Sequence, residues 1–417
     1  MKKALKLVGL LLLLVGLAAG GAATFIALDW PVKHPVKAPE LKVEATPERL
    51  ARGKLLVSVR CAGCHYNQQT GTLSGQQMME APKEFGPMFS HNITQHATKG
   101  IGRYTDGELL VLLRTGVRRD GYFTGPFMQS PYLADEDMSS IIAFLRSDDP
   151  SLAATDKDDR QWQPTFLAKI LMHVAFKPMA MPAAKIEPPN PSDQIALGRY
   201  VAQAVGDCFV CHSADFKTLN SITPEKSGGY FGGGNGTLDA SRNVVRSANL
   251  TMDPETGIGK WSEEEFVRAT RSGVRSDGRV LRFPMLAFSE LSETEVKAVY
   301  AYLKTVPPIR HAVDRAFDVY PEMSPSASEG EKLYNKYACY SCHGKNGVGI
   351  CDLRQASKKY DTNEKLSAFI HDPAKFVPGT KMPTWGELIP DAQFPSLIAH
   401  IHKLERERAA VGAPLAH

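Results

Sequence analysis

The chain has 417 residues, of which 43% are hydrophobic and 23% are charged, a composition typical of globular proteins and not of disordered ones. This length exceeds that of one small domain and accommodates about three modules of roughly 100 residues each. The formal net charge is +4, and the Lys and Arg residues are dispersed rather than gathered in one stripe. We therefore do not expect this protein to bind nucleic acid.

The N-terminus combines three early lysines with a long uncharged segment, residues 7–28. As a helix this segment would be about 33 Å long, enough to cross a hydrocarbon core of roughly 30 Å. Residues 1–30 therefore form either a transmembrane anchor or a cleaved signal: the length favours the anchor, whereas the small residues at 18–23 offer cleavage points. In both interpretations the lysines stay cytoplasmic, and the rest of the chain lies on the periplasmic side of the membrane.

Three CxxCH motifs follow: Cys61-Ala-Gly-Cys64-His65, Cys208-Phe-Val-Cys211-His212 and Cys339-Tyr-Ser-Cys342-His343. In such a motif the two thiols add to the vinyl groups of one haem, and the histidine becomes the proximal iron ligand. A zinc site would require partner cysteine pairs, whereas here each pair is followed at once by a histidine. We therefore predict three covalently bound haem c groups. Only Cys351 is left outside the motifs, so no structural disulfide within the chain is expected.

The segment after the first motif recurs after the second. Asn92-Ile-Thr94 and Arg114-Thr-Gly-Val-Arg118 reappear 157 residues later as Asn249-Leu-Thr251 and Arg271-Ser-Gly-Val-Arg275. The two motifs themselves are 147 residues apart, so the second copy contains ten additional residues before the shared segment. The glycine-rich stretch 228–236 lies there, and we expect it to form a flexible surface loop.

Helical patterns surround each motif. Short helices are expected before the motifs, at 47–59, 192–205 and 326–337, and apolar periodic helices are expected at the module ends, at 135–146, 293–305 and 394–404. Each leading helix contains or borders a glycine, namely Gly53, Gly198 or Gly330, at which the first and last helices of a module can cross closely. Strand signals are sparse, which predicts all-α modules.

A methionine precedes each closing helix in an irregular, proline-containing loop. Met128 and Met285 are related by the repeat distance of 157 residues, and Met382 lies in Pro378-Gly-Thr-Lys-Met-Pro383. A thioether opposite the histidine closes the iron coordination and raises the potential, so we predict these three as sixth ligands. The competing methionines in the first module are Met78, Met79, Met88 and Met138. Four other histidines are expected to be surface or hydrogen-bonded residues: His91, His96, His173 and His371.

With these motifs the chain resembles the three-haem cytochrome c subunits of bacterial membrane-bound alcohol, gluconate and related sugar or aldehyde dehydrogenases. The shared pattern is CxxCH, Asn-Ile/Leu-Thr, Gly-Ile-Gly, Arg-x-Gly-Val-Arg-x-Asp-Gly and the methionine loop, present twice before a shorter third module. It spans about residues 48–404. One departure concerns Met128, which follows Pro126-Phe127 instead of the Pro-Met-Pro of many relatives.

The resemblance implies an all-α fold of three tandem class I cytochrome c-like domains after the N-terminal apolar helix. The predicted units are 1–30 (anchor or signal), 44–150 (domain 1), 151–190 (linker), 191–306 (domain 2), 307–325 (linker), 326–405 (domain 3) and 406–417 (tail). The first linker contains an amphipathic segment, 166–176, which either packs across the modules as a connecting helix or presents a docking face for a partner or the bilayer.

The resemblance also implies an electron conduit without catalytic residues of its own. A catalytic dehydrogenase subunit would oxidise a substrate, and the electrons would pass through this chain to membrane quinone or another respiratory acceptor. One alternative is a cytochrome that feeds a terminal oxidase or another respiratory complex. The other is a haem enzyme, such as a multihaem peroxidase or a sulfur-oxidising cytochrome. Catalysis at iron requires an open coordination position, and the three methionines argue against one.

Overall fold

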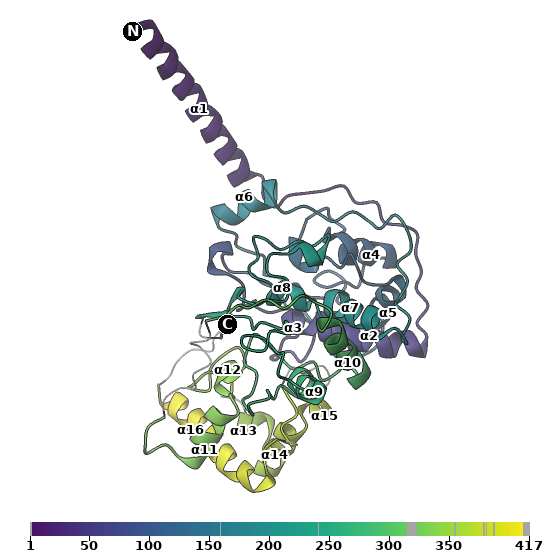
Figure 1. The fold of residues 1–417 in the computed structure, drawn as a ribbon, viewed down its shortest axis with the longest axis vertical. Helices are drawn as coiled ribbons and strands as arrows, with labels where there is room; N and C mark the ends of the chain where they lie inside the picture. The colour runs from purple at the N-terminus through teal and green to yellow at the C-terminus, as the bar shows by residue number, and fades with distance from the viewer. Residues whose placement is uncertain are drawn as a thin grey trace.

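The computed structural model describes residues 2–158, 160–240, 242–314, 323–353, 356–377, 380, 382–386 and 388–411. Helices predominate, and one long N-terminal helix projects from the body of the molecule (Figure 1). The helices up to the first linker are α1 (Lys2–Leu28), α2 (Pro47–Arg60), α3 (Ala62–His65), α4 (Asp106–Thr115), α5 (Asp135–Leu145) and α6 (Phe166–Val174). The next are α7 (Gln194–Tyr200), α8 (Cys208–His212), α9 (Glu263–Ser272) and α10 (Glu293–Leu303). The last are α11 (Glu329–Lys336), α12 (Tyr340–His343), α13 (Ala356–Lys359), α14 (Asn363–His371), α15 (Pro373–Phe376) and α16 (Phe394–Val411).

The expected helix pairs are present, and each pair crosses at the expected glycine. A Cβ atom added to Gly53 of α2 would lie 2.0 Å from the Ser140 carbonyl oxygen of α5. The same addition at Gly198 of α7 would lie 1.8 Å from the carbonyl oxygen of Ala298 in α10. At Gly330 of α11 the Cβ would lie 2.0 Å from a carbonyl oxygen of α16. Only glycine permits these backbones to come so close, so three residues fix three crossings.

The sequence repeat is a structural repeat. Both α4 and α9 begin at a capping box, Thr105 with Glu108 and Ser262 with Glu265, and both end at a glycine in the left-handed region. After each of these helices an isolated bridge closes a turn, at Val117–Phe123 and 157 residues later at Val274–Val280. The N-cap hydroxyl and the N3 carboxylate satisfy backbone N–H groups that the helix itself leaves unpaired, which is why the pattern starts a helix in both copies.

The glycine-rich stretch of the second copy is buried, so the expectation of a flexible surface loop is wrong. Phe231 is fully buried, and its ring packs edge-on against Tyr230 and Tyr302. Gly233 and Gly234 have positive φ values, which let the chain turn tightly around these rings. At the last residue of this stretch begins β1 (Gly236–Leu238), which pairs antiparallel with β2 (Val244–Arg246) in a small hairpin that the all-α expectation did not include.

The first two modules share one hydrophobic core. A single cluster of buried side chains extends from Leu56 of α2 to Leu303 of α10, and a second cluster surrounds α11, α14 and α16. Polar contacts reinforce the shared core: the Arg52 guanidinium of α2 binds Asp137 of α5 at 2.8 Å and Glu295 of α10 at 2.8 Å. Because α2 holds a carboxylate from each copy, the two modules pack as one body.

The third module ends in a helix longer than expected. The sequence predicts the end of this helix at residue 404, whereas α16 continues to Val411, and residues 412–417 lie outside the described residues. Lys403 and Glu407, one helical turn apart, form an ion pair at 3.7 Å that supports this extension. In Figure 1 the third module lies at the end of the body that is farthest from α1.

Candidate haem sites

Each CxxCH motif ends on a short helix that directly follows a crossing helix. The first motif occupies α3, immediately after α2, and the third occupies α12, after α11. In the second copy α7 continues into a π turn, η4 (Val201–Val205), before α8. The glycine crossings thereby fix where each leading helix ends, and with it the position of the two cysteines and the histidine.

All three motif histidines are held in the same tautomer. Nδ1 of His65 lies 2.7 Å from the His91 carbonyl oxygen, and Nδ1 of His212 lies 2.8 Å from that of Ala248. In the third motif Nδ1 of His343 lies 3.1 Å from the carbonyl oxygen of Cys351. A carbonyl oxygen can only accept, so Nδ1 carries the proton and the lone pair belongs to Nε2. This is the arrangement that metal-ligating histidines use, with one nitrogen held by the protein and the other directed to the metal.

The motif cysteines lie in an environment that disfavours charge. Burial raises the pKa of Cys208 and of Cys339 to about 12 each, so both thiols are neutral at physiological pH. Burial likewise raises the pKa of Cys64, whose thiol lies 3.7 Å from the Glu80 carboxylate. Burial also lowers the pKa of His343 and keeps its imidazole neutral.

These features fit haem c at each motif. Two thiols and one imidazole whose Nδ1 is held by a backbone carbonyl oxygen are the donor set that covalent haem attachment needs. In the residues that the structure describes, no group of three or more His, Cys, Asp and Glu side chains is arranged to hold a bare metal ion. The zinc alternative has no second set of ligands to complete it there.

The predicted methionine ligands lie in the loops before the closing helices. Met128 ends the 3₁₀ turn η2 (Pro126–Met128) and packs, partly buried, against the shared core. Met285 is also partly buried, and its backbone N–H donates to the Arg282 carbonyl at 3.0 Å. Met382 packs against the second core cluster, although its neighbours 378, 379 and 381 lie outside the described residues. Their role as sixth ligands stays a prediction.

The alternative ligands have other contacts. Met138 is buried within α5, whereas Met88 is buried in a loop of the first module and stays a competitor of Met128. Nδ1 of His96 accepts backbone N–H groups of the following turn, and His173 pairs with Asp29 at 3.2 Å. His371 stacks on a phenylalanine of α16 with ring centroids 5.9 Å apart, and the His91 carbonyl is the group that holds His65.

In the first two modules a repeated arginine, fully buried in the first copy and partly buried in the second, contacts the chain between the predicted methionine ligand and the closing helix. Arg114 is 1% exposed, and its guanidinium donates to the carbonyl oxygens of Ser130 at 3.1 Å and Leu133 at 2.6 Å, just beyond Met128. Its counterpart Arg271 donates to the Leu291 carbonyl at 2.8 Å, just before α10. The repeated Arg-x-Gly-Val-Arg segment therefore ties the methionine loop to the start of the closing helix.

The repeated Asn-x-Thr element has a comparable role. Oδ1 of Asn92 accepts from the backbone N–H of Thr94 at 3.0 Å, and its amide donates to the Thr155 carbonyl at 2.9 Å. Asn249 repeats the arrangement, because its amide donates to the Ile309 carbonyl at 2.7 Å. In both copies the asparagine ties the loop that holds the motif histidine to the chain leaving the module.

The three motifs gather near the junction of the modules. Cys211 of the second motif is one of the groups that raise the pKa of the Cys64 thiol, so the first two motifs lie near each other. The Gln68 amide, just after the first motif, lies 2.7 Å from the Cys351 sulfur, just after the third. Arg282 of the second methionine loop donates to the Tyr340 hydroxyl within the third motif at 3.1 Å. Each motif thus has a contact to another module within a few residues.

Comparisons with known proteins agree with this geometry. Residues 50–149 match the family model described as "Cytochrome c", and residues 325–401 match "Cytochrome C oxidase, cbb3-type, subunit III". Two segments of this helix-rich chain thus match cytochrome c domain models, which indicate covalently bound haem c.

Relatives that match 70–74% of the chain include cytochrome subunits of dehydrogenases, which confirms the resemblance predicted from the motifs. The chain is 26% identical to the fructose dehydrogenase cytochrome subunit of Gluconobacter japonicus, over 73% of this chain and 65% of the relative. It is 27% identical to the cytochrome c subunit of the quinone alcohol dehydrogenase of Gluconacetobacter polyoxogenes, over 70% and 64%. The gluconate 2-dehydrogenase cytochrome c subunit of Pantoea cypripedii is 26% identical, over 74% and 72%. This cytochrome therefore spans slightly less than two thirds of the first two relatives.

Proposed function

We propose that this cytochrome carries three haem c groups in three tandem cytochrome c-like domains, 44–150, 191–306 and 326–405, and serves as the electron-transfer subunit of a dehydrogenase. The observation that carries the proposal is a single arrangement found three times. In each case a leading helix crosses a closing helix at a glycine, a CxxCH motif follows, and a carbonyl oxygen holds Nδ1 of the motif histidine. The internal repeat relates the first two copies directly.

The residues of the chain would divide the work at each site in the same way. The cysteine pairs Cys61/Cys64, Cys208/Cys211 and Cys339/Cys342 would hold the haem groups covalently, and His65, His212 and His343 would ligate the irons. Met128, Met285 and Met382 would be the second protein ligands. When bound, haem supplies one-electron redox chemistry, with a potential that a methionine ligand raises. The chain contributes no acid or base to a substrate reaction and is not itself the catalyst.

The electron donor in this proposal is a catalytic dehydrogenase subunit on the periplasmic side, and the acceptor is membrane quinone or another respiratory component. The three relatives described above are named as cytochrome subunits of dehydrogenases, which supports a dehydrogenase as the donor. The candidate anchor α1 supports an acceptor in the membrane. The match of residues 325–401 to an oxidase subunit model favours a second acceptor, a terminal oxidase. Mixing reduced cytochrome with a short-chain quinone and, separately, with an oxidase separates the two acceptors, because only the true acceptor reoxidises the haems rapidly.

Mass spectrometry of the denatured holoprotein tests the haem count. We expect three covalent porphyrin adducts in the natural chain. Replacing both cysteines of one motif by Ala, that is Cys64, Cys211 or Cys342 with its partner cysteine, should leave two adducts. The variant Cys351→Ala is the matched control, because this cysteine lies outside the motifs and its loss leaves three adducts. Two or fewer adducts in the natural chain would refute the three-haem proposal.

A further inference from the structure

The short helix α6 lies beside the C-terminal end of the apolar helix α1 (Figure 1) and forms a hydrogen bond with its last turn. Nε2 of His173 lies 3.2 Å from the Asp29 carboxylate, and Nζ of Lys169 donates to the Ala27 carbonyl at 2.9 Å. The Phe25 ring packs edge-on against His173, with centroids 5.7 Å apart. These contacts join the last turn of α1 to a helix that belongs to the linker after the first domain.

The chain that follows α1 is fixed in the folded body. Trp30 packs edge-on against Trp162 at 5.3 Å, and the Trp162 indole donates to the Phe85 carbonyl at 2.9 Å. Trp30 also packs against a small buried cluster of Val117, Phe123 and Met172, the last of which belongs to α6. The direction in which α1 leaves the body is therefore set by packing on both sides of Asp29.

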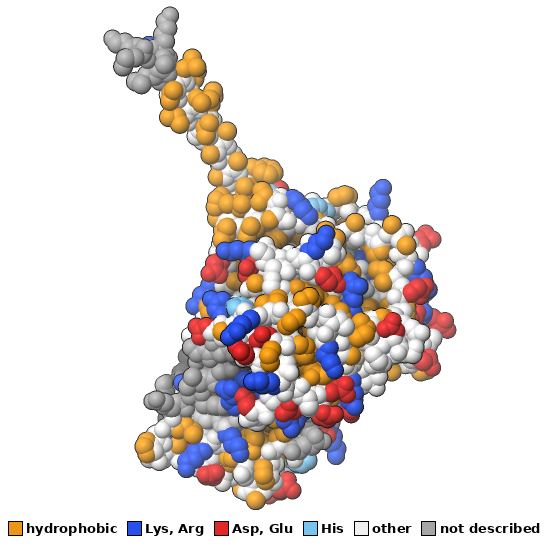
Figure 2. All heavy atoms as spheres, viewed as in Figure 1, with side chains coloured by type: hydrophobic (Ala, Val, Ile, Leu, Met, Phe, Trp, Pro, Cys, Tyr) orange, Lys and Arg blue, Asp and Glu red, His pale blue; other side chains and the backbone are white. Residues whose placement is uncertain are grey.

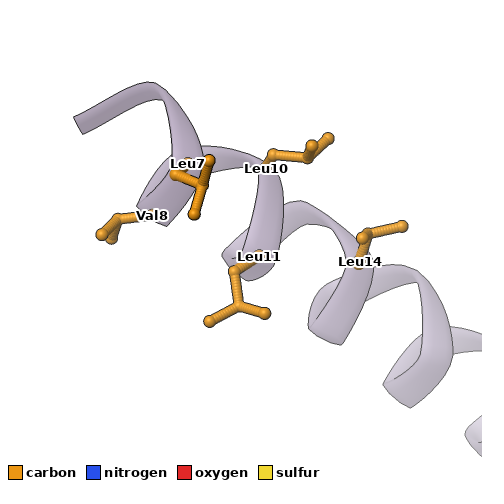
Figure 3. A pocket seen from close by; sticks show the side chains of 5 residues that line it. All are labelled: Leu7, Val8, Leu10, Leu11 and Leu14. Atoms are coloured by element: carbon orange, nitrogen blue, oxygen red, sulfur yellow. The ribbon is translucent and has the colours of Figure 1, made fainter. Parts of the chain in front are cut away.

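The outward face of α6 is apolar and exposed, whereas its inward face is buried. Ala168 and Met172 are fully buried against the body, but Phe166 is 48% exposed, Leu167 49% and Val174 65%. Figure 2 shows the hydrophobic surface continuing from α1 onto the adjoining end of the body. Along residues 6–28 of α1 no side chain is buried, and Figure 3 shows leucines 7, 10, 11 and 14 projecting on more than one side of the helix.

We propose that α6 lies flat in the interfacial layer of the bilayer that α1 spans, with its exposed apolar face in contact with the acyl chains. The inference rests on the proposal that α1 is a retained membrane anchor. Continuity carries it: residues 6–28 are apolar enough to cross a bilayer and none of them is buried, and α6 is bonded to the end of this segment. A surface that begins where α1 ends meets lipid before it can meet another protein.

The residues around α6 have the chemistry of a membrane interface. Tryptophans are enriched at the level of the lipid headgroups. Trp30 follows the end of α1 and packs against Trp162, so this pair would lie at that level. Lysines at this level keep the ammonium group in water or near anionic headgroups, while their aliphatic stems cover apolar surface. Lys169 lies in α6, and Lys177 follows it. Interfacial helices insert an apolar face about 5–10 Å into this layer. Together α1 and α6 give the first domain a fixed orientation on the membrane.

Nitroxide labels on the full-length holoprotein test this arrangement. Cys351→Ser removes the one cysteine outside the motifs, and the label is then placed at Leu167→Cys or Val174→Cys. The protein is reconstituted in vesicles of phosphatidylethanolamine and phosphatidylglycerol without any partner protein. The readout is the collision rate of the label with oxygen, which concentrates in the acyl region, relative to a water-soluble nickel chelate. Label positions on exposed side chains leave the core intact, and the haem spectrum checks the fold.

Two controls bracket the result. Val244→Cys in β2 is the matched aqueous control, because Val244 is 60% exposed on a hairpin of the second module, and Leu17→Cys in α1 is the lipid control. We expect the oxygen-to-nickel ratio at Leu167 and Val174 to exceed that at Val244 at least fivefold and to approach that at Leu17. Ratios at both α6 positions equal to that at Val244, with a high ratio at Leu17, would overturn the docking of α6 alone. A low ratio at Leu17 would refute the anchor and the docking together, and neither result alters the haem count.

Discussion

The crossing glycines offer the sharpest test of the fold, and Gly198→Ala is the most severe substitution among them. The new Cβ would lie 1.8 Å from the Ala298 carbonyl oxygen and 2.8 Å from the Tyr302 Cβ, whereas ordinary contact begins near 3.4 Å. The obstacle is the backbone of a packed helix, so α7 and α10 must separate. Overpacking a core usually costs about 1–3 kcal/mol, and a clash with backbone belongs at or above the upper end.

This cost should appear as a lower melting temperature of the shared core. For a cooperative unit of 150–250 residues, roughly the size of the first two domains together, 1 kcal/mol lowers Tm by about 2–4 °C. A loss of about 3 kcal/mol therefore corresponds to roughly 6–12 °C, measured by calorimetry of the holoprotein. Gly330→Ala should instead lower a second transition, because Gly330 lies in the third module, whose residues make up the second core cluster except for Val280.

Gly63→Ala is the matched control for this experiment. No atom lies within 4 Å of a Cβ added at Gly63, and the other two motifs carry Val210 and Ser341 at the same position. A methyl group should be accommodated there with a change in Tm of less than about 2 °C. If Gly198→Ala melts at the same temperature as Gly63→Ala, then α7 and α10 do not cross as described.

Three further predictions concern the domain contact, an iron ligand and the anchor. Arg52→Ala leaves the carboxylates of Asp137 and Glu295 without their shared cation. It should lower the free energy of unfolding of the shared core by roughly 1–3 kcal/mol in denaturant titrations, less than the loss of a fully buried ion pair. The control Arg49→Ala removes a more exposed ion pair and should cost under about 1 kcal/mol. Met382→Ala should make the reduced protein bind carbon monoxide at one haem and should lower the potential of that haem in a redox titration, whereas an unchanged spectrum would assign the ligand elsewhere. Carbonate washing of membranes should leave the protein in the pellet if α1 is retained, and a soluble protein beginning between residues 20 and 24 would show a cleaved signal.

Local patterns in the sequence were sufficient to predict the leading and closing helices of each module, and they also indicate candidate residues for each haem site. A CxxCH motif specifies its chemistry within five residues, and the capping boxes at Thr105 and Ser262 start a helix through bonds that span three residues. The crossing glycines were also predictable, because one lies in the helix before each motif and a residue without a side chain lets two helices approach closely. The motifs and the helix caps depend on neighbours in the chain, which a sequence displays directly.

Other features depend on contacts between distant residues and emerged only in the tertiary structure. The glycine-rich stretch has a loop composition, yet Phe231 is fully buried because Tyr302, 71 residues later in the chain, supplies the ring on which it packs. The role of Arg114 depends on carbonyl groups beyond Met128, and the shared core depends on Arg52 meeting Glu295. The sequence by itself determined which residues can attach and ligate haem, since covalent chemistry requires particular side chains at particular spacing. How the three sites are brought together, and which face α6 turns outward, was decided by packing across the whole chain.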